Sequence, residues 1–208
     1  MSRPTLDYEN AWKHKGCTCI AGIDEAGRGP LAGPVCVAAV ILPDGFEHEV
    51  LNDSKQLSEK KRERIFEELI VCAGLRWSVV FGDVEEIDRI NILQATHAAM
   101  RQAALMLTPQ PEVVLIDGLA VLDFPIQQQA LVKGDALSLS IAAASVIAKV
   151  TRDRLMLEAA KKYPQYGFEK HKGYGTKQHL AALEKHGPCP LHRRSFAPVA
   201  QLLLSFDA

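Results

Sequence analysis

The sequence lacks any apolar run long enough to cross a membrane. The longest, VCVAAVIL at residues 35–42, has 8 residues, whereas a transmembrane helix needs about 20. The opening stretch MSRPTLDYENAWKHKG also lacks the apolar segment of a secretory signal peptide. We therefore expect a cytoplasmic protein with no membrane partner.

Paired cysteines of the kind that bind zinc are also missing. The chain has 5 cysteines, and none of them forms a CxxC pair. Cys17 and Cys19 could begin a metal site, but two small strand residues facing the same side are the simpler interpretation.

Net charge is small as well, at −1, which alone argues against a nucleic-acid-binding protein. The net charge differs strongly between two parts of the chain. Residues 1–132 contain 12 Lys/Arg against 19 Asp/Glu, and residues 133–194 contain 12 against 5. The second stretch could therefore form a surface that attracts phosphates, or its basic residues could simply be spread over solvated helices.

The elements that are present indicate an α/β domain. With 48% hydrophobic and 24% charged residues, the composition is that of an ordinary globular protein. Apolar runs predict strands at residues 18–24, 35–42, 76–84, 113–117 and 127–132. Caps and apolar stripes predict helices at residues 58–72, 87–107, 138–162, 176–186 and 197–205. We expect a mixed sheet covered by helices in residues 1–163, and a small helical C-terminal region in residues 164–208.

Four acidic residues lie at positions where a catalytic or ligand-binding site is expected. Asp24 and Asp117 each follow an apolar strand, at the end of the sheet where α/β proteins gather ligand sites. Glu25 lies between the first strand and a glycine-rich turn, and Asp135 precedes the long helix. The structural alternatives are turn formation for the strand-end acids and helix N-capping for Asp135.

If the four acids meet, they require cations. Two carboxylates about 4 Å apart repel by roughly 4 kcal/mol at an effective dielectric constant near 20. Mg²⁺ is bound by a few carboxylates while a substrate phosphate completes its coordination, and a pair of such ions supports phosphodiester hydrolysis. The following glycines, Gly27 and Gly29 around Arg28, would let a substrate backbone approach the ions closely, unless they only form a hairpin turn.

The residues resemble the ribonuclease HII family over nearly the whole chain from residue 18 to residue 196. The matching segments are GIDEAGRGPLAGPV (22–35), DSKQLS (53–58), IDRINILQAT (87–96), VLIDG, KGDALSLSIAAASVIAKVTRD (133–153), YGFEKHKGYGTKQH (166–179) and HRRSF (192–196). They occur in the family's order and spacing.

This resemblance implies an RNase H-like fold with a mixed five-stranded sheet. It also implies an endoribonuclease that uses Mg²⁺ or Mn²⁺, with Asp24, Glu25, Asp117 and Asp135 as catalytic and metal-binding residues. The implied substrates are the RNA strand of RNA–DNA hybrids and single ribonucleotides embedded in duplex DNA. Cleavage 5′ of the ribonucleotide would leave 3′-hydroxyl and 5′-phosphate ends, with roles in ribonucleotide excision repair and DNA replication.

By the same resemblance, Tyr174 is the tyrosine that senses the ribonucleotide, together with the backbone of Gly27, Arg28 and Gly29. Only the 2′-hydroxyl distinguishes RNA from DNA at one sugar, so an aromatic ring and free backbone groups suit this task. Predicted phosphate contacts are Lys55, Lys172 and Lys177, although each could be an ordinary solvated lysine. Ser145 and Lys149 share one helix face with Arg152, which could contact phosphate or pack against the sheet.

The last segment, QLLLSF, begins at Gln201, ends at Phe206 and resembles a peptide that binds the bacterial sliding clamp. A short amphipathic helix packed on the domain explains the same residues. We expect the protein to be a monomer.

Two other functions fit part of the sequence. A non-catalytic nucleic-acid-binding module would use the basic stretch and keep the acids as turns and caps. A small-molecule metallophosphatase would need the acids but not Tyr174.

Overall fold

The structure is a computed structural model that describes residues 3–48, 51 and 57–206. A five-stranded sheet forms its centre, in the order β3-β2-β1-β4-β5. β1 (Ile20–Ala26), β2 (Val35–Ile41) and β3 (Arg76–Gly82) are antiparallel neighbours, whereas β4 (Val113–Asp117) and β5 (Gln127–Leu131) run parallel to β1. The predicted mixed five-stranded sheet is therefore confirmed.

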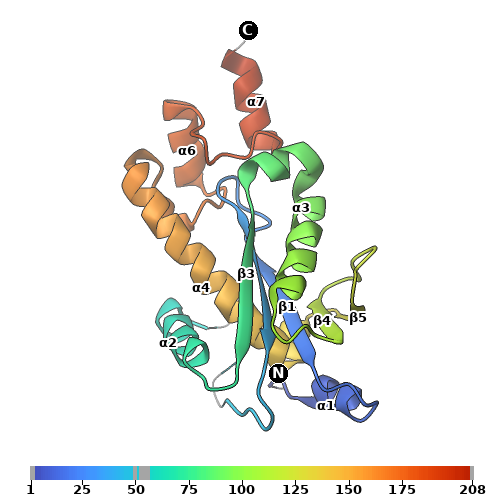
Figure 1. Cartoon of the computed structure of the whole chain (residues 1–208). Helices are drawn as coiled ribbons and strands as arrows, with labels where there is room; N and C mark the ends of the chain where they lie inside the picture. The colour runs from blue at the N-terminus through green and yellow to red at the C-terminus, as the bar shows by residue number, and fades with distance from the viewer. Residues whose placement is uncertain (1–2, 49–50, 52–56, 207–208) are drawn as a thin grey trace.

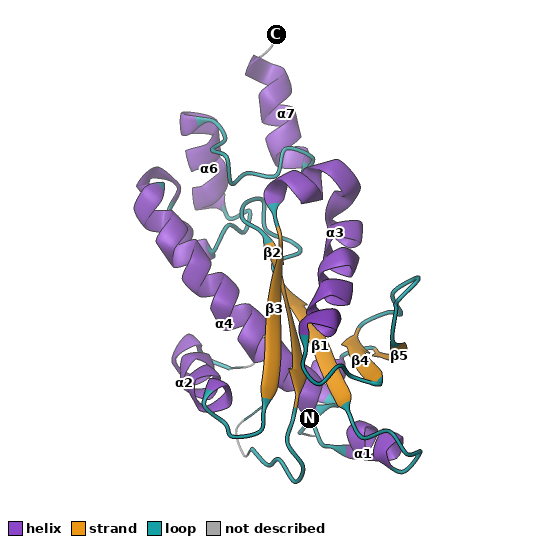
Figure 2. Cartoon of the chain, in the orientation of Figure 1, coloured by secondary structure: helices purple, strands orange, loops and turns teal. Residues whose placement is uncertain are grey.

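Two long helices cover the two faces of this sheet, as Figures 1 and 2 show. α4 (Leu139–Lys162) packs against β1 and β2, and α3 (Val84–Met106) packs against β3 and β2. Successive side chains of a strand point to opposite faces. Ala21 and Ile23 of β1 accordingly join the apolar cluster on the α3 side, while Gly22 faces α4.

Gly22 allows β1 and α4 to approach each other unusually closely. A Cβ atom at this position would lie 2.2 Å from the main-chain carbon of Ser140, so a larger residue would push the helix away. The carboxylate of Glu9, on α1 (Asp7–Lys13), fixes the same end of α4 by accepting hydrogen bonds from the Ser138 and Ser140 hydroxyls and from the Ser140 N–H. No pattern in the sequence predicted α1.

Three helices begin directly after a Ser or Thr residue that stands at the predicted helix start. Ser58, Ser138 and Thr176 cap α2 (Glu59–Ile70), α4 and α6 (Lys177–His186) with their side-chain oxygens. Short helical turns connect these elements, namely η1 (Gly134–Ala136), η2 (Pro164–Tyr166) and α5 (Phe168–His171), and α7 (Ala197–Phe206) closes the chain.

The bounds of two elements differ from the predictions, and the alternative role of Asp135 as a helix cap is excluded. β1 continues through Glu25 to Ala26, because β2 supplies partners for both residues. α3 begins at Val84, and its helical conformation is interrupted at Asn91, where φ is 70°. Asp135 does not cap α4; it lies inside η1, and Ser138 is the cap.

The C-terminal region packs against the rest of the chain. Tyr166 and Phe168 join Ala32 and Met156 in one apolar cluster. In α7, Leu202 and Leu203 are half-buried against a cluster that contains Leu31, Leu183 and Val199. Among the described helices, none is both long enough and apolar enough to cross a membrane.

Candidate active site

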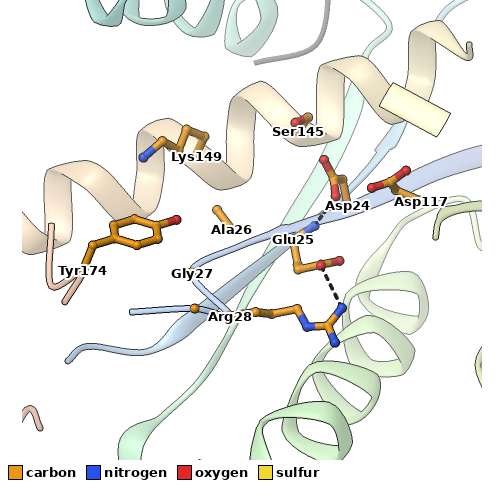
Figure 3. Close-up of a pocket in the computed structure, with 10 residues that line it drawn as sticks. Asp24, Glu25, Ala26, Gly27, Arg28, Asp117, Ser145, Lys149 and Tyr174 are labelled. Atoms are coloured by element: carbon orange, nitrogen blue, oxygen red, sulfur yellow. Dashed lines mark hydrogen bonds and ion pairs between the residues drawn. The ribbon is translucent and has the colours of Figure 1, made fainter. Parts of the chain in front are cut away.

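A cavity of about 210 Å³ opens at the carboxyl ends of β1 and β4 (Figure 3). Parallel pairing of Ile23 with Ile116 places the next residues, Asp24 and Asp117, side by side. The residues that line the cavity come from β1, the following loop, β4, α4 and the segment before α6: Asp24, Glu25, Ala26, Gly27, Arg28, Gly29, Asp117, Ser145, Lys149 and Tyr174. The fold thus brings together residues from segments that are far apart in the sequence.

The adjacent acids Asp24 and Glu25 point in different directions because both belong to strand β1. Asp24 is buried and faces α4, whereas the Glu25 carboxylate is turned towards Arg28, as Figure 3 shows. The Arg28 guanidinium lies 3.3 Å from the Glu25 carboxylate. Strand alternation turns the two carboxylates in different directions, and the ion pair with Arg28 compensates part of the charge of Glu25.

Asp24 occupies an electrostatically unfavourable position. Burial, followed by the charges of Glu25 and Asp117, raises the pKa of Asp24 well above its usual range. A hydrogen bond from Ser145 and the main-chain N–H of Glu25, 2.7 Å away, only partly oppose this effect. The carboxylate form of Asp24 therefore needs a further positive charge in the cavity.

Asp117 and Asp135 are linked through Gly134. The N–H of Gly134 donates a 2.7 Å hydrogen bond to the Asp117 carboxylate. A Cβ atom on Gly134 would lie 2.7 Å from the terminal methyl carbon of Ile141, so a larger residue here would require the Ile141 side chain to move. Asp135 follows directly, is buried, and is not among the residues that line the cavity.

The acidic residues suit a divalent cation, although they do not form a closed cage. Across residues 3–48, 51 and 57–206, no three His, Cys, Asp or Glu side chains form a ready-made metal cluster. Carboxylate oxygens are the ligands that Mg²⁺ and Mn²⁺ prefer, and the raised pKa of Asp24 is the effect that a bound cation would reverse.

Opposite the acids, the loop of residues 27–29 lies next to Tyr174. Gly27 has a φ of 95°, and a Cβ atom there would lie 1.9 Å from Nε of Arg152. On Gly29, a Cβ atom would be 3.7 Å from the Tyr174 ring. Tyr174 is 44% exposed, so its ring and the loop backbone are both accessible from the cavity.

The predicted phosphate contacts have different surroundings. Lys149 lines the cavity and forms a 2.7 Å ion pair with Asp153. Lys172 is buried, donates to the Glu169 carbonyl, 2.6 Å away, and lies 4.0 Å from the Glu59 carboxylate, so its ammonium already has partners within the protein. Lys177 is exposed at the start of α6, away from the cavity lining, and Lys55 lies outside the described residues.

Comparison with known proteins identifies the family. The family model of ribonuclease HII matches residues 21–199. The chain belongs to the ribonuclease HII family. The predicted resemblance is thereby confirmed, and the enzyme is favoured over a non-catalytic binding module. Ribonuclease HII of Bacillus cereus (strain AH820) is 57% identical over 196 residues, covering 94% of this chain and 76% of that protein. Ribonuclease HII of Bacillus anthracis (strain CDC 684 / NRRL 3495) has the same identity and coverage.

Solved structures share the ribonuclease HII fold. Ribonuclease H2 from Pyrococcus horikoshii OT3 superposes with a TM-score of 0.76 at 26% identity, over 91% of this chain and 99% of that one. RNase HII of Archaeoglobus fulgidus, solved in complex with PCNA, gives 0.71 at 27% identity, over 86% and 95%. Bst-RNase HIII in complex with Mn²⁺ shares the fold, with a TM-score of 0.70 at 18% identity, over 91% and 70%.

Two buried arginines behind the cavity were not predicted as functional residues from the sequence. Arg193 stands in the HRRSF segment, and Arg152 shares a helix face with Ser145 and Lys149. Both guanidinium groups hold the loops that carry Gly27 and Tyr174. The only signal in the sequence was their position inside family segments, since main-chain acceptors leave no pattern of residue types.

Proposed function

We propose that this member of the ribonuclease HII family hydrolyses the RNA strand of RNA–DNA hybrids and cuts 5′ of single ribonucleotides in duplex DNA. The products would carry 3′-hydroxyl and 5′-phosphate ends. A role in ribonucleotide excision repair follows from the second activity.

One observation carries the proposal. The buried carboxylate of Asp24, the carboxylate of Asp117, the 27–29 loop and the Tyr174 ring line one cavity. Acids on one side can serve the phosphate, and the loop with Tyr174 on the other side can contact the sugar of a ribonucleotide. A phosphatase acting on small molecules would not need the 27–29 loop and Tyr174.

Asp24, Glu25, Asp117 and Asp135 would hold Mg²⁺ or Mn²⁺. When bound, a pair of divalent ions lowers the pKa of an attacking water and stabilises the leaving oxygen. The chain itself positions the acidic side chains. Strand pairing fixes Asp24 beside Asp117, the Gly134 N–H orients the Asp117 carboxylate, and Lys149 adds positive charge on the α4 side.

Tyr174 and the 27–29 loop would select the cleavage position. Their accessible groups are a phenol and main-chain N–H groups, which can hydrogen-bond to a 2′-hydroxyl without reading the base. We therefore expect the enzyme to recognise a ribonucleotide whatever its base. Phosphate contacts of Lys177 and Lys55 would add affinity that decreases with salt.

The test uses a DNA duplex that contains one ribonucleotide, with Mg²⁺, with Mn²⁺ or with a chelator. We expect a cut 5′ of the ribonucleotide with either ion and none with the chelator. Asp24→Asn should abolish cleavage, and Asp44→Asn, which alters an exposed acid outside the cavity, should not. Cleavage in the chelator, or by Asp24→Asn at the unmodified rate, would contradict the proposal.

Contact with a sliding clamp through residues 201–206 stays a prediction. In α7 this segment is helical, and Leu202 and Leu203 pack on the protein, so an extended clamp-bound form would have to detach them. Deletion of residues 201–208 tests the idea. Unchanged retention on immobilised clamp would refute it.

A further inference from the structure

Two arginine side chains are buried directly behind the loop that faces the substrate. Arg193 has no exposed surface, and Arg152 is 1% exposed. Burying a guanidinium is costly unless its N–H groups find acceptors. Here each arginine finds three, and all six acceptors are main-chain carbonyl oxygens.

Arg193 holds the 27–29 loop itself. Its Nη2 donates to the Gly27 carbonyl at 2.6 Å, its Nη1 donates to the Arg28 carbonyl at 2.8 Å, and its Nε donates to the Gly33 carbonyl at 2.9 Å. These bonds fix three peptide planes around the turn. Because the planes are fixed, the remaining groups of the loop keep a constant direction towards the cavity.

Arg152 connects that loop to the segment that bears Tyr174. It donates to the carbonyls of Ala32 and Pro34 on one side and to the carbonyl of Lys172 on the other. The Leu31 N–H also donates to the Gly173 carbonyl, and the Arg193 N–H donates to the Leu31 carbonyl. The two halves of the proposed sugar contact are thus joined by one buried network.

A third element, α3, anchors the residues that follow Arg193. The Asp88 carboxylate accepts hydrogen bonds from the main-chain N–H groups of Arg194 and Ser195, each 2.9 Å, and from the Ser195 hydroxyl at 2.6 Å. Asp88 lies in the first segment of α3, before the interruption at Asn91. The IDRINILQAT and HRRSF segments therefore meet here, although neither contributes a side chain to the cavity lining.

We propose that Arg193 is a positioning residue that sets the geometry of the 27–29 loop relative to Tyr174, and that Asp88 and Ser195 hold Arg193 in place. The proposal rests on the proposed function, since this loop is the part of the site that would contact the ribonucleotide. Lysine cannot replace Arg193, because its three N–H donors radiate from one atom and cannot reach three separate carbonyls in a fork.

The experiment compares Arg193→Met and Arg193→Lys with Arg76→Gln. Arg76 is exposed at the start of β3, beside Ile41 and at the opposite end of the sheet from the cavity, so it controls for loss of an arginine. Cleavage of the single-ribonucleotide duplex is measured well below the melting temperature of each variant. Mn²⁺ binding by calorimetry reports whether the acids remain in place.

For both Arg193 variants we expect kcat to fall by about 100-fold, as for an ångström-scale displacement of positioning groups. KM should rise as well, while Mn²⁺ affinity stays within about twofold. Amide hydrogen exchange should become faster in residues 26–34 and 172–176. A purely structural role predicts instead a lower active fraction with KM unchanged. Full activity in Arg193→Met, or a change of kcat alone, would overturn the proposal.

Asp88→Ala gives an independent test if Arg193→Met does not fold, because Asp88 is only half-buried. It should reproduce the KM increase and the kcat decrease to a lesser degree, and Ser195→Ala should have a smaller effect still. In the Arg193→Met background, Asp88→Ala should add little, because both residues act through the same loop. Wild-type activity of Asp88→Ala, or additive losses, would contradict the network. Failure of the unmodified protein to cut the duplex would instead refute the proposed function.

Discussion

Gly27→Ala is the change that most directly tests how the cavity is built. Gly27 has a φ of 95°, and an added Cβ atom would lie 1.9 Å from Nε, 2.3 Å from Cδ and 2.8 Å from Cζ of Arg152. Real Cβ contacts are never this short, so Arg152 or the loop must move. Overpacking of this kind costs about 1–3 kcal/mol, in addition to about 1–3 kcal/mol for an alanine at positive φ.

Gly16 provides a matched control, because its φ is also 95° and nothing lies within 4 Å of its Cβ position. Gly16→Ala should therefore carry the backbone strain alone. We expect Gly27→Ala to be less stable than Gly16→Ala by about 1–3 kcal/mol, which corresponds to about 2–4 °C per kcal/mol in the melting temperature of a chain of this size. Thermal melts and urea unfolding measure this difference.

Activity should separate the two variants further. Gly27→Ala shifts the loop beside the acids and should lose most cleavage of a duplex with one ribonucleotide, whereas Gly16→Ala should keep it. If both variants lose the same stability and both cleave normally, the close contact between Gly27 and Arg152 does not shape the site.

Three further predictions follow from the charges of the site and its surroundings. In the absence of divalent ions at pH 7, Asp24→Asn should raise the melting temperature. Burial and the charge of Glu25 raise the pKa of Asp24 in the folded protein, so above the pKa of the unfolded chain this carboxylate lowers the stability of the folded state. A lower melting temperature of the variant would contradict this. Burial, with a second histidine ring beside it, lowers the pKa of His192 from 6.5 to about 4. The unfolded chain then binds a proton that the folded protein does not, so the free energy of unfolding should decrease as pH falls from about 7 to 4, by up to about 3 kcal/mol. His192→Phe should flatten this dependence in urea titrations at pH 7 and 5, and an unaltered slope would refute the assignment. Arg28→Gln should remove the ion pair that turns Glu25 away and tighten Mn²⁺ binding up to about fivefold, since an ion pair near the surface is worth about 0–1 kcal/mol. Calorimetry that finds weaker binding would exclude this competition.

Much of the fold could be predicted because its signals are local. Apolar runs marked all five strands, and Ser58, Ser138 and Thr176 marked the starts of three helices. The proximity of Asp24 and Asp117 followed from a general rule on strand ends, and parallel pairing of β1 with β4 places them together.

Other features depend on contacts that residue types do not encode. The extension of β1 through Glu25 requires a partner in β2, and this extension sends Glu25 to the opposite face from Asp24. The first segment of α3, before the interruption at Asn91, contacts Ser195 through Asp88. The acceptors of Arg193 are main-chain oxygens, which every residue has, so no sequence pattern could reveal them.

The hydrogen bond from Gly134 to Asp117 has a consequence for how the site responds to change. Because Asp135 is the next residue, the same peptide segment controls two acids that come from different parts of the chain. A displacement of η1 alters both together and leaves Asp24 on its strand. Substitutions that displace η1 should therefore abolish binding of the divalent ion, because they affect two of its proposed ligands at once and not one.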